Sequence, residues 1–176
     1  RMERVPVPEI GPGELLVEVK AAAVCGTDVR IFQNGAANVS PETPLILGHE
    51  IAGVICAVGK HVTAYQVGQR VAIAPNFGCG VCSACVSGNG QLCPEYQALG
   101  IHMAGGFAEY VRVPAKAVAS GNVTPIPDGV SFQAAAVNEP LSCAFNGSER
   151  CGIRPGDTVV IIGAGPIGIM HAMLAE

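Results

Sequence analysis

Residues 76–93 read NFGCGVCSACVSGNGQLC, a glycine-rich stretch in which cysteine recurs at positions 79, 82, 85 and 93. Four thiolates at this spacing can complete a tetrahedral shell around one zinc ion, and the interspersed glycines let the backbone wrap around it at small steric cost. The stretch therefore predicts a structural zinc lobe whose ligands are Cys79, Cys82, Cys85 and Cys93.

Other kinds of site also use closely spaced cysteines. An iron–sulfur cluster is the closer alternative, since Cys93 precedes Pro94 as in bacterial ferredoxins, but the gap before the last cysteine is longer here. Disulfides would suit a small secreted domain, yet the chain shows no signal peptide and is not disulfide-dense for its length. A nucleic-acid zinc module would bring basic residues, and none lies between Asn76 and Tyr96. Structural zinc is therefore the favoured interpretation.

The composition excludes further classes of function. Charged residues make up 14% of the 176 residues and hydrophobic residues 49%, so the chain can bury a core. A net charge of −4 with few lysines argues against a nucleic-acid partner, because phosphate binding needs clustered Lys and Arg. Cys56, Cys143 and Cys151 lie in apolar or helical surroundings and are predicted to be buried thiols. This cysteine usage suits a reducing cytoplasm.

The long apolar stretch at residues 159–175 is predicted to be a strand and a helix rather than a membrane span. It is short for a span, and glycines, Pro166 and His171 interrupt it. The chain opens in mid-pattern and stops at Glu176 inside an apolar helical pattern with no stop signal. We therefore expect a fragment of a longer protein.

Short strands punctuated by Gly and Pro are expected at residues 14–20, 49–58, 69–74 and 106–113, which is typical of a small barrel-like β domain. The pattern changes near Asp128. Ser131 is a good N-cap for a helix over residues 132–137, and Pro140 suits the first turn of a second helix ending near Glu149. Residues 158–162 read as a fully apolar strand of parallel-sheet type.

Glycines at positions 163, 165 and 168 follow that strand and open a helical pattern. This order strengthens an otherwise weak motif: Gly163 permits the turn, Gly165 lets backbone N–H groups approach a pyrophosphate, and Gly168 lets helix and strand pack closely. The helix N-terminus adds partial positive charge. The segment, with Pro166 and Ile167 inside it, predicts a dinucleotide site.

A second candidate metal site is split between two short motifs. Cys25-Gly-Thr-Asp28 supplies a thiolate, and Gly48-His49-Glu50 supplies an imidazole and a carboxylate, the mixed ligands of a catalytic zinc. Taken singly, each residue has an ordinary explanation: a buried thiol, a hydrogen-bonded histidine and an exposed charge. Spacing alone favours those explanations.

Together with the cysteine lobe, these motifs resemble the zinc-dependent medium-chain alcohol dehydrogenase family, in its polyol and threonine dehydrogenase branch. The matching segments occur in the family's order and cover nearly the whole chain; besides those above they are residues 105–110 (GGFAEY) and 138–141 (NEPL). The resemblance implies a mixed α/β fold: a GroES-like β-barrel catalytic domain over residues 1–150, with its zinc lobe at 76–95, followed at 151–176 by the first βα unit of a truncated Rossmann domain.

The resemblance also implies roles for individual residues. Cys25 and His49 are expected to bind the catalytic zinc, with Glu50 as a ligand or an exchangeable neighbour. Glu139 stands where typical alcohol dehydrogenases place a second cysteine, and such a carboxylate binds the zinc or its water. Thr27 is expected to accept the proton of the substrate alcohol. The catalytic residues would thus be Thr27, Glu50 and Glu139, whereas Arg30 replaces a relay histidine and cannot pass the proton on.

The function implied is hydride transfer between a secondary alcohol, polyol or related hydroxy compound and NAD or NADP, with two zinc ions per chain. A homo-oligomer, dimer or tetramer, is expected of the full-length protein, and this chain alone is expected to be inactive. A non-enzymatic zinc-binding scaffold and a zinc-free reductase remain as alternatives, although Cys25, His49, Glu50 and Glu139 speak against the latter. The residue that selects NAD or NADP would lie beyond Glu176.

Overall fold

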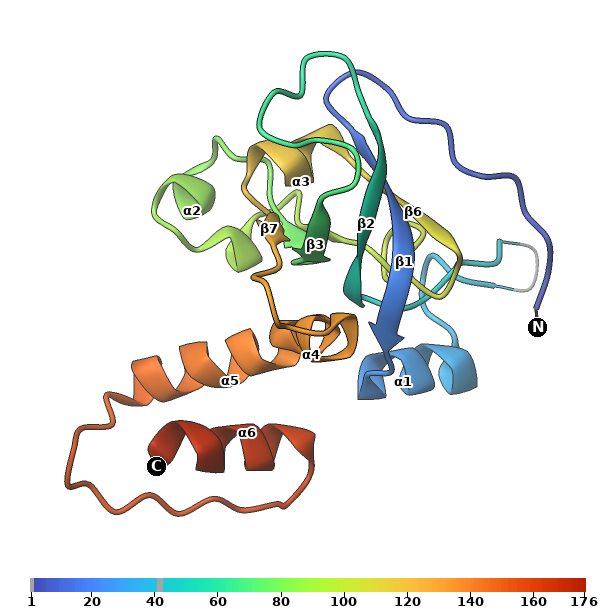
Figure 1. The fold of residues 1–176 in the computed structure, drawn as a ribbon. Helices are drawn as coiled ribbons and strands as arrows, with labels where there is room; N and C mark the ends of the chain where they lie inside the picture. Colours follow the sequence, from blue (N-terminus) through green and yellow to red (C-terminus); the bar gives the residue numbers. More distant parts are fainter. Residues whose placement is uncertain (1, 41–42) are drawn as a thin grey trace.

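The computed structural model describes residues 2–40 and 43–176, in which the main feature is a five-stranded antiparallel sheet with the order β6-β1-β2-β3-β7 (Figure 1). Its strands are β1 (Leu15–Ala23), β2 (Glu50–Val58), β3 (Arg70–Ile73), β6 (Tyr110–Val113) and β7 (Val123–Pro125). A second sheet pairs β4 (Asn76–Phe77) with β5 (Gln97–Ala98) at the base of the cysteine lobe.

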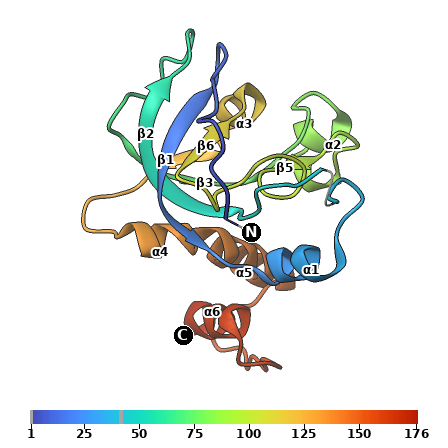
Figure 2. The same ribbon diagram turned by 90° about the vertical axis from the view of Figure 1, so that its right-hand side faces the viewer.

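Helices α1 (Gly26–Asn34), α4 (Phe132–Ala136), α5 (Asn138–Cys151) and α6 (Pro166–Ala175) gather beyond one end of this sheet (Figure 2). The short helices α2 (Ser83–Val86), η1 (a 3₁₀ helix, Gly90–Leu92) and α3 (Ala115–Ala119) lie apart from them. Helix α4 packs against β1, β2 and β3, and α6 packs against α5. The mixed α/β fold is therefore confirmed.

The core lies on the face of the sheet where alternate side chains point inward. Leu15 and Val17 of β1 and Ile51 and Ile55 of β2 are almost fully buried, and burial of each such side chain contributes about 1.5–3 kcal/mol. The other face is covered by α4: Ala52 packs with the α4 alanines. The small side chains let α4 approach the sheet closely, which brings α5 up to the end of β2.

Three of the four predicted strands are confirmed within a few residues. The fourth, expected at residues 106–113, begins only at Tyr110. The backbone N–H groups of residues 105–107 donate instead to the carbonyl groups of residues 46–48, at 2.8–2.9 Å. Residues 105–107 therefore hold the loop before β2 in place and do not extend strand β6. Helices α1 and α3 and strand β7 were outside the sequence-based expectations.

The predicted helices after Asp128 are confirmed. The hydroxyl of Ser131 accepts a hydrogen bond from the Ala134 N–H at 3.1 Å, as an N-cap does. Helix α5 begins at Asn138, with Pro140 in its first turn as expected, and is terminated at Gly152, which adopts the left-handed conformation with φ 65°.

The strand expected at residues 158–162 is not formed. The segment pairs with no strand among the described residues, and Val160 and Ile162 are 80% and 97% exposed. A parallel strand is stable only when neighbours satisfy its backbone groups and cover both faces, and this part of the structure supplies none. Helix α6 forms nonetheless, so only the helical part of the predicted βα unit is confirmed. Within residues 2–40 and 43–176, no helix has the length and apolarity needed to cross a membrane.

Candidate functional site

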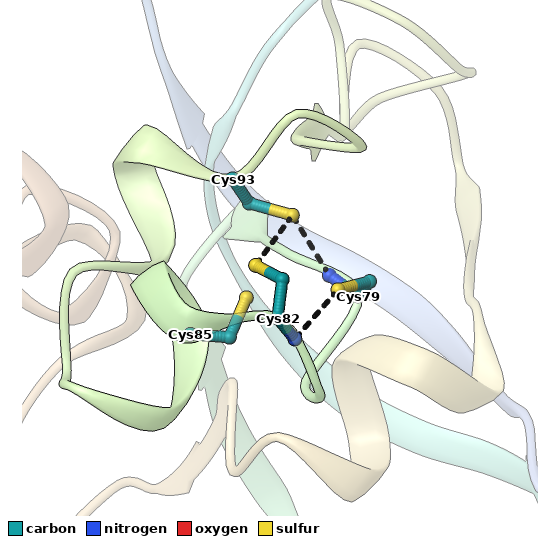
Figure 3. A group of neighbouring side chains, drawn as sticks. All are labelled: Cys79, Cys82, Cys85 and Cys93. Atoms are coloured by element: carbon teal, nitrogen blue, oxygen red, sulfur yellow. Dashed lines mark hydrogen bonds between the residues drawn. The ribbon is translucent and has the colours of Figure 1, made fainter.

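The four cysteines of the lobe converge on one point (Figure 3). Their sulfur atoms all lie within 4.8 Å of one another, and Cys82 Sγ lies 3.8 Å from Cys93 Sγ. A Zn–S bond of about 2.3 Å places two sulfurs of a tetrahedral site about 3.8 Å apart. All eight cysteines are free thiols, so the disulfide alternative has no support in the structure, and the lobe is compatible with a structural zinc ion.

Backbone N–H groups and a glycine accommodate the sulfur atoms of the lobe. The N–H of Cys79 donates to Cys93 Sγ at 3.2 Å, and the N–H of Cys82 donates to Cys79 Sγ at 3.3 Å. A Cβ on Gly78 would lie 2.5 Å from Cys85 Sγ, so this position needs glycine. These contacts hold the four thiols in one small volume.

The acidity of these thiols differs across the lobe. Hydrogen bonds from the backbone N–H groups of Val81 and Cys82 lower the pKa of Cys79 to about 6. The pKa of Cys85 is raised to about 11, because desolvation and the neighbouring thiols outweigh a backbone hydrogen bond at Gly80 that lowers it. The protein alone thus stabilises one thiolate but opposes another, and a bound cation would remove that conflict.

The residues of the second candidate metal site also lie close together in the structure. Cys25 lies between β1 and α1, and His49 and Glu50 lie at the start of β2; one donor atom from each lies within 4.8 Å of the others. His49 and Glu50 are 6% and 4% exposed, and His49 Nδ1 has no hydrogen-bond partner. A buried unpartnered imidazole nitrogen is rare, so this trio is a candidate cation site.

Asp28 organises this trio, a role that sequence reasoning missed. Its Oδ2 accepts the N–H of Cys25 at 2.8 Å, and its Oδ1 accepts the N–H of Gly48 at 3.0 Å and lies 3.4 Å from His49 Nδ1. Asp28 is 3% exposed. Its position at the third residue of α1, where a carboxylate can cap the helix start, was the only signal in the sequence.

The loop that presents His49 requires glycine at position 48. Gly48 has φ 91°, and a Cβ there would lie 2.5 Å from the ring of Phe107. A Cβ on Gly105 would in turn overlap the carbonyl oxygen of Gly48. The hydrogen bonds between residues 46–48 and 105–107 therefore hold the His49 backbone in a single close-packed arrangement.

Glu139 lies near the trio but outside the group whose donors share the 4.8 Å limit. Burial raises the pKa of Glu139, and the neighbouring His49 opposes this rise. Burial also raises the pKa of Glu50, and the charge of Glu139 raises it further. Two partly desolvated carboxylates near one imidazole are stabilised by a shared proton or by a cation, so the donor set fits a metal ion.

The remaining predicted residues are placed as follows. Thr27 is half-buried in the first turn of α1, two residues after Cys25, and Arg30 on the same helix is exposed. The expectation of buried thiols is wrong for Cys143 and Cys151, which are exposed, and Cys56 is only partly buried. Cys143 is exposed because it lines an open cleft on the face of α5 that carries Glu139, with its Sγ 3.7 Å from Glu139 Oε1.

The predicted phosphate-binding glycines open helix α6. Gly165 is the N-cap, Pro166 is the first helical residue, and Gly163 has φ 112°. A Cβ on Gly168 would overlap the Gly163 carbonyl oxygen, which is the close approach the motif predicts. The Ser148 hydroxyl on α5 lies 3.0 Å from His171 Nδ1 and joins the two helices.

Comparison with known proteins identifies the family. The family model for the alcohol dehydrogenase GroES-like domain matches residues 11–128, so the chain belongs to this family of zinc-dependent medium-chain dehydrogenases. It is 43% identical over 176 residues to an L-threonine 3-dehydrogenase of Chelativorans sp. (strain BNC1), covering 99% of this chain and 49% of that protein. It is 39% identical over 178 residues to the sorbitol dehydrogenase of Bacillus subtilis (strain 168), covering 100% and 49%.

Solved structures support the same family assignment. A protein from Sinorhizobium meliloti 1021 assigned as a zinc-binding dehydrogenase and bound to NADP superposes with a TM-score of 0.86 at 40% identity, covering 97% of this chain and 48% of that one. The chain spans about half the length of the curated relatives it matches. The GroES-like fold expected from the sequence is thereby confirmed.

Proposed function

We propose that this chain forms the zinc-binding catalytic part of a dehydrogenase that transfers hydride between a secondary alcohol, polyol or related hydroxy compound and NAD or NADP. The observation that carries the proposal is the trio of Cys25, His49 and Glu50 with its unpartnered imidazole nitrogen. Relatives named for threonine and sorbitol, both hydroxy compounds, support the substrate class. Residues 1–150 form the catalytic domain, and residues 151–176 begin the nucleotide-binding domain.

Zinc bound here would act as a Lewis acid that lowers the pKa of a substrate hydroxyl. Cys25 and His49 would hold the ion, while Glu50 and Glu139 serve as further ligands or as close carboxylate neighbours. Asp28 accepts the backbone N–H of Cys25 and lies 3.4 Å from His49 Nδ1, so its carboxylate would help to orient the donors. Cys79, Cys82, Cys85 and Cys93 would hold the second, structural zinc.

Thr27 would take the proton of the substrate hydroxyl, because its own hydroxyl can both accept and donate a hydrogen bond. Arg30, three residues later, stays protonated at neutral pH and cannot continue the relay. The proton therefore leaves through water or the ribose hydroxyls of the cofactor. Hydride transfer itself is the chemistry of the nicotinamide.

The cofactor phosphates would bind at the N-terminus of α6, near Gly163, Gly165, Pro166, Ile167 and Gly168. This proposal is supported by the positive φ of Gly163 and the closeness of Gly168 to the preceding turn. The free thiols of the chain suit a reducing cytoplasm, where we place the protein. We further propose that it assembles as a homo-oligomer, a dimer or a tetramer.

The test is metal analysis combined with turnover of the whole natural protein that contains this chain. Two zinc ions per chain are expected, one of them removed by a chelator together with activity. Sorbitol, L-threonine, butanediol and inositol, each with NAD and with NADP, form the substrate panel. One tightly held zinc and no turnover with any pair would instead favour a non-enzymatic zinc-binding scaffold, an alternative that the unpaired segment 158–162 keeps open.

A further inference from the structure

A cleft of about 280 Å³ opens between helix α5 and the end of strand β3. Residues 72–76 form part of one side, and residues of α5 form the other. Glu139 is the one charged residue among the described residues that line it. The other polar lining residues carry neutral amides and hydroxyls: Asn76, Thr124, Asn138, Ser142 and Asn146.

This lining matches an uncharged ligand with several hydroxyl groups. An amide or a hydroxyl side chain can both donate and accept a hydrogen bond, as an alcohol does. A carboxylate or phosphate on the ligand would call for a cationic partner, and no Lys or Arg lines the cleft among the residues that the structure describes. The cleft therefore favours a neutral polyhydroxy compound over an anionic one.

The cleft lies one strand away from the trio of Cys25, His49 and Glu50. Ile73, which lines the cleft, pairs with Ile51 of β2, and Ile51 directly follows Glu50. Neighbouring strands are about 4.8 Å apart. A substrate of a few carbon atoms can therefore extend from the proposed metal centre into the cleft.

Asn76 is held at the edge of this cleft from three directions. Its backbone pairs with Ala98 of β5, and its carbonyl oxygen accepts from Nδ2 of the buried Asn122 at 2.6 Å. Its side-chain Oδ1 accepts from the Tyr96 hydroxyl, also at 2.6 Å. This bond sets which way the amide faces. The Nδ2 group of Asn76 makes no hydrogen bond within the described part of the chain, so an oriented donor remains for a ligand.

We propose that Asn76 is a specificity-determining residue that donates from Nδ2 to a second hydroxyl of the substrate, next to the one that reacts, and that Tyr96 is a positioning residue that orients its amide. The inference rests on the proposed function above and narrows the substrate class to compounds with neighbouring hydroxyl groups. A monohydroxy alcohol offers Nδ2 no such acceptor. Loss of one neutral hydrogen bond of this kind lowers kcat/KM by about 2–10-fold.

Two alcohols that differ by one hydroxyl test the proposal: butane-2,3-diol and butan-2-ol. The diol preference is the ratio of their kcat/KM values, measured for the whole natural protein that contains this chain and for its variants. Asn76→Asp keeps an oxygen that accepts from Tyr96 but removes the Nδ2 donor. Tyr96→Phe removes the hydroxyl and keeps the ring that contacts His102. Asn89→Asp and Tyr65→Phe are matched controls, because both side chains make their hydrogen bonds outside the cleft.

We expect Asn76→Asp and Tyr96→Phe each to lower the diol preference by about 2–10-fold, mainly through a higher KM for the diol. Both control variants should keep the preference of the unmodified protein. An unchanged preference in Asn76→Asp overturns the role of Asn76, while turnover of the diol still supports the proposed dehydrogenase. An equal loss in Tyr65→Phe also overturns the inference, because a general loss of packing then explains the effect.

The substrate panel separates failure of this inference from failure of the proposed function. Turnover of L-threonine alone overturns the inference and keeps the dehydrogenase, since threonine carries a single hydroxyl beside charged groups. No turnover of any compound in the panel overturns the proposed function, and the inference with it.

Discussion

Asp28 and His49 are linked through a single buried carboxylate oxygen, Asp28 Oδ1, which lies 3.4 Å from Nδ1 of the imidazole and accepts the N–H of Gly48 at 3.0 Å. The other oxygen of Asp28 accepts the N–H of Cys25 at 2.8 Å. One side chain thus holds the two segments that carry the thiolate and the imidazole. Asp28 therefore orients the donors of the proposed metal centre.

The first prediction concerns the charge of Asp28. Asp28→Asn keeps an oxygen acceptor but removes the negative charge beside His49, so zinc affinity at this site should fall by about 10–100-fold. Titration of the chain with zinc against a competing chelator measures this. Affinity for the ion in the cysteine lobe should not change, which provides an internal control.

The alanine variant separates orientation from folding. Asp28→Ala leaves the partly buried N–H of Cys25 and the buried N–H of Gly48 without their acceptor, and a buried unsatisfied group costs about 1–3 kcal/mol. Denaturant unfolding should therefore show a larger loss of stability for Asp28→Ala than for Asp28→Asn. Equal zinc affinity in the Asn variant and the unmodified chain would show that Asp28 serves only the fold.

The second prediction concerns the close contact between Gly48 and Phe107. Gly48→Ala places a Cβ 2.5 Å from the Phe107 ring and a side chain at φ 91°. The left-handed backbone costs about 1–2 kcal/mol, and the clash adds about 1–3 kcal/mol. Equilibrium unfolding in urea measures the sum.

Gly68→Ala is the matched control for the backbone cost. Gly68 has φ 88°, and a Cβ there would meet nothing within 4 Å. It should lose only the backbone contribution. The double change Gly48→Ala with Phe107→Ala should behave like Gly68→Ala plus the separate effect of Phe107→Ala. If Gly48→Ala still loses more stability than Gly68→Ala when residue 107 is alanine, the contact with Phe107 does not set the position of the loop.

The third prediction concerns the cysteine lobe. Cys82→Ser removes one of four thiolates, and the chain should then hold one zinc fewer and unfold at a lower temperature, because structural zinc contributes folding free energy directly. Metal analysis and thermal unfolding measure the two effects. Cys56→Ser should retain full zinc content. A Cys82→Ser variant that keeps its zinc and its melting temperature would show that the lobe is not a structural zinc site.

The sequence identified the residues of the candidate metal site more readily than the residues that position them. Cys25, His49 and Glu50 were recognisable because their order matched a family, although spacing alone could not bring residue 25 beside residue 49. Strand pairing makes that contact: Ala23 at the end of β1 pairs with Glu50 at the start of β2. Such a register depends on long-range packing and cannot be read from local periodicity.

For Cys143 the prediction from the local sequence pattern was wrong. An apolar helical pattern predicted a buried thiol, but burial on α5 depends on which face meets the sheet, and only Ala144 of this helix is buried. The strand expected at residues 158–162 failed for a related reason. Its apolar side chains would suit the interior of a sheet, but a strand also needs neighbouring strands that pair with its backbone.

The last prediction concerns the attachment of α6 to α5. The Ser148 hydroxyl lies 3.0 Å from His171 Nδ1 in a partly buried position, and such a hydrogen bond contributes about 0.5–1.5 kcal/mol. Ser148→Ala should therefore accelerate amide hydrogen exchange within residues 166–175 without changing exchange in the sheet. Ser142→Ala is the control, because the Ser142 hydroxyl donates within α5 to the Asn138 carbonyl oxygen at 2.7 Å. Unchanged exchange in α6 of Ser148→Ala would mean that apolar packing alone holds this helix, and the predicted dinucleotide loop at its N-terminus would then be positioned independently of α5.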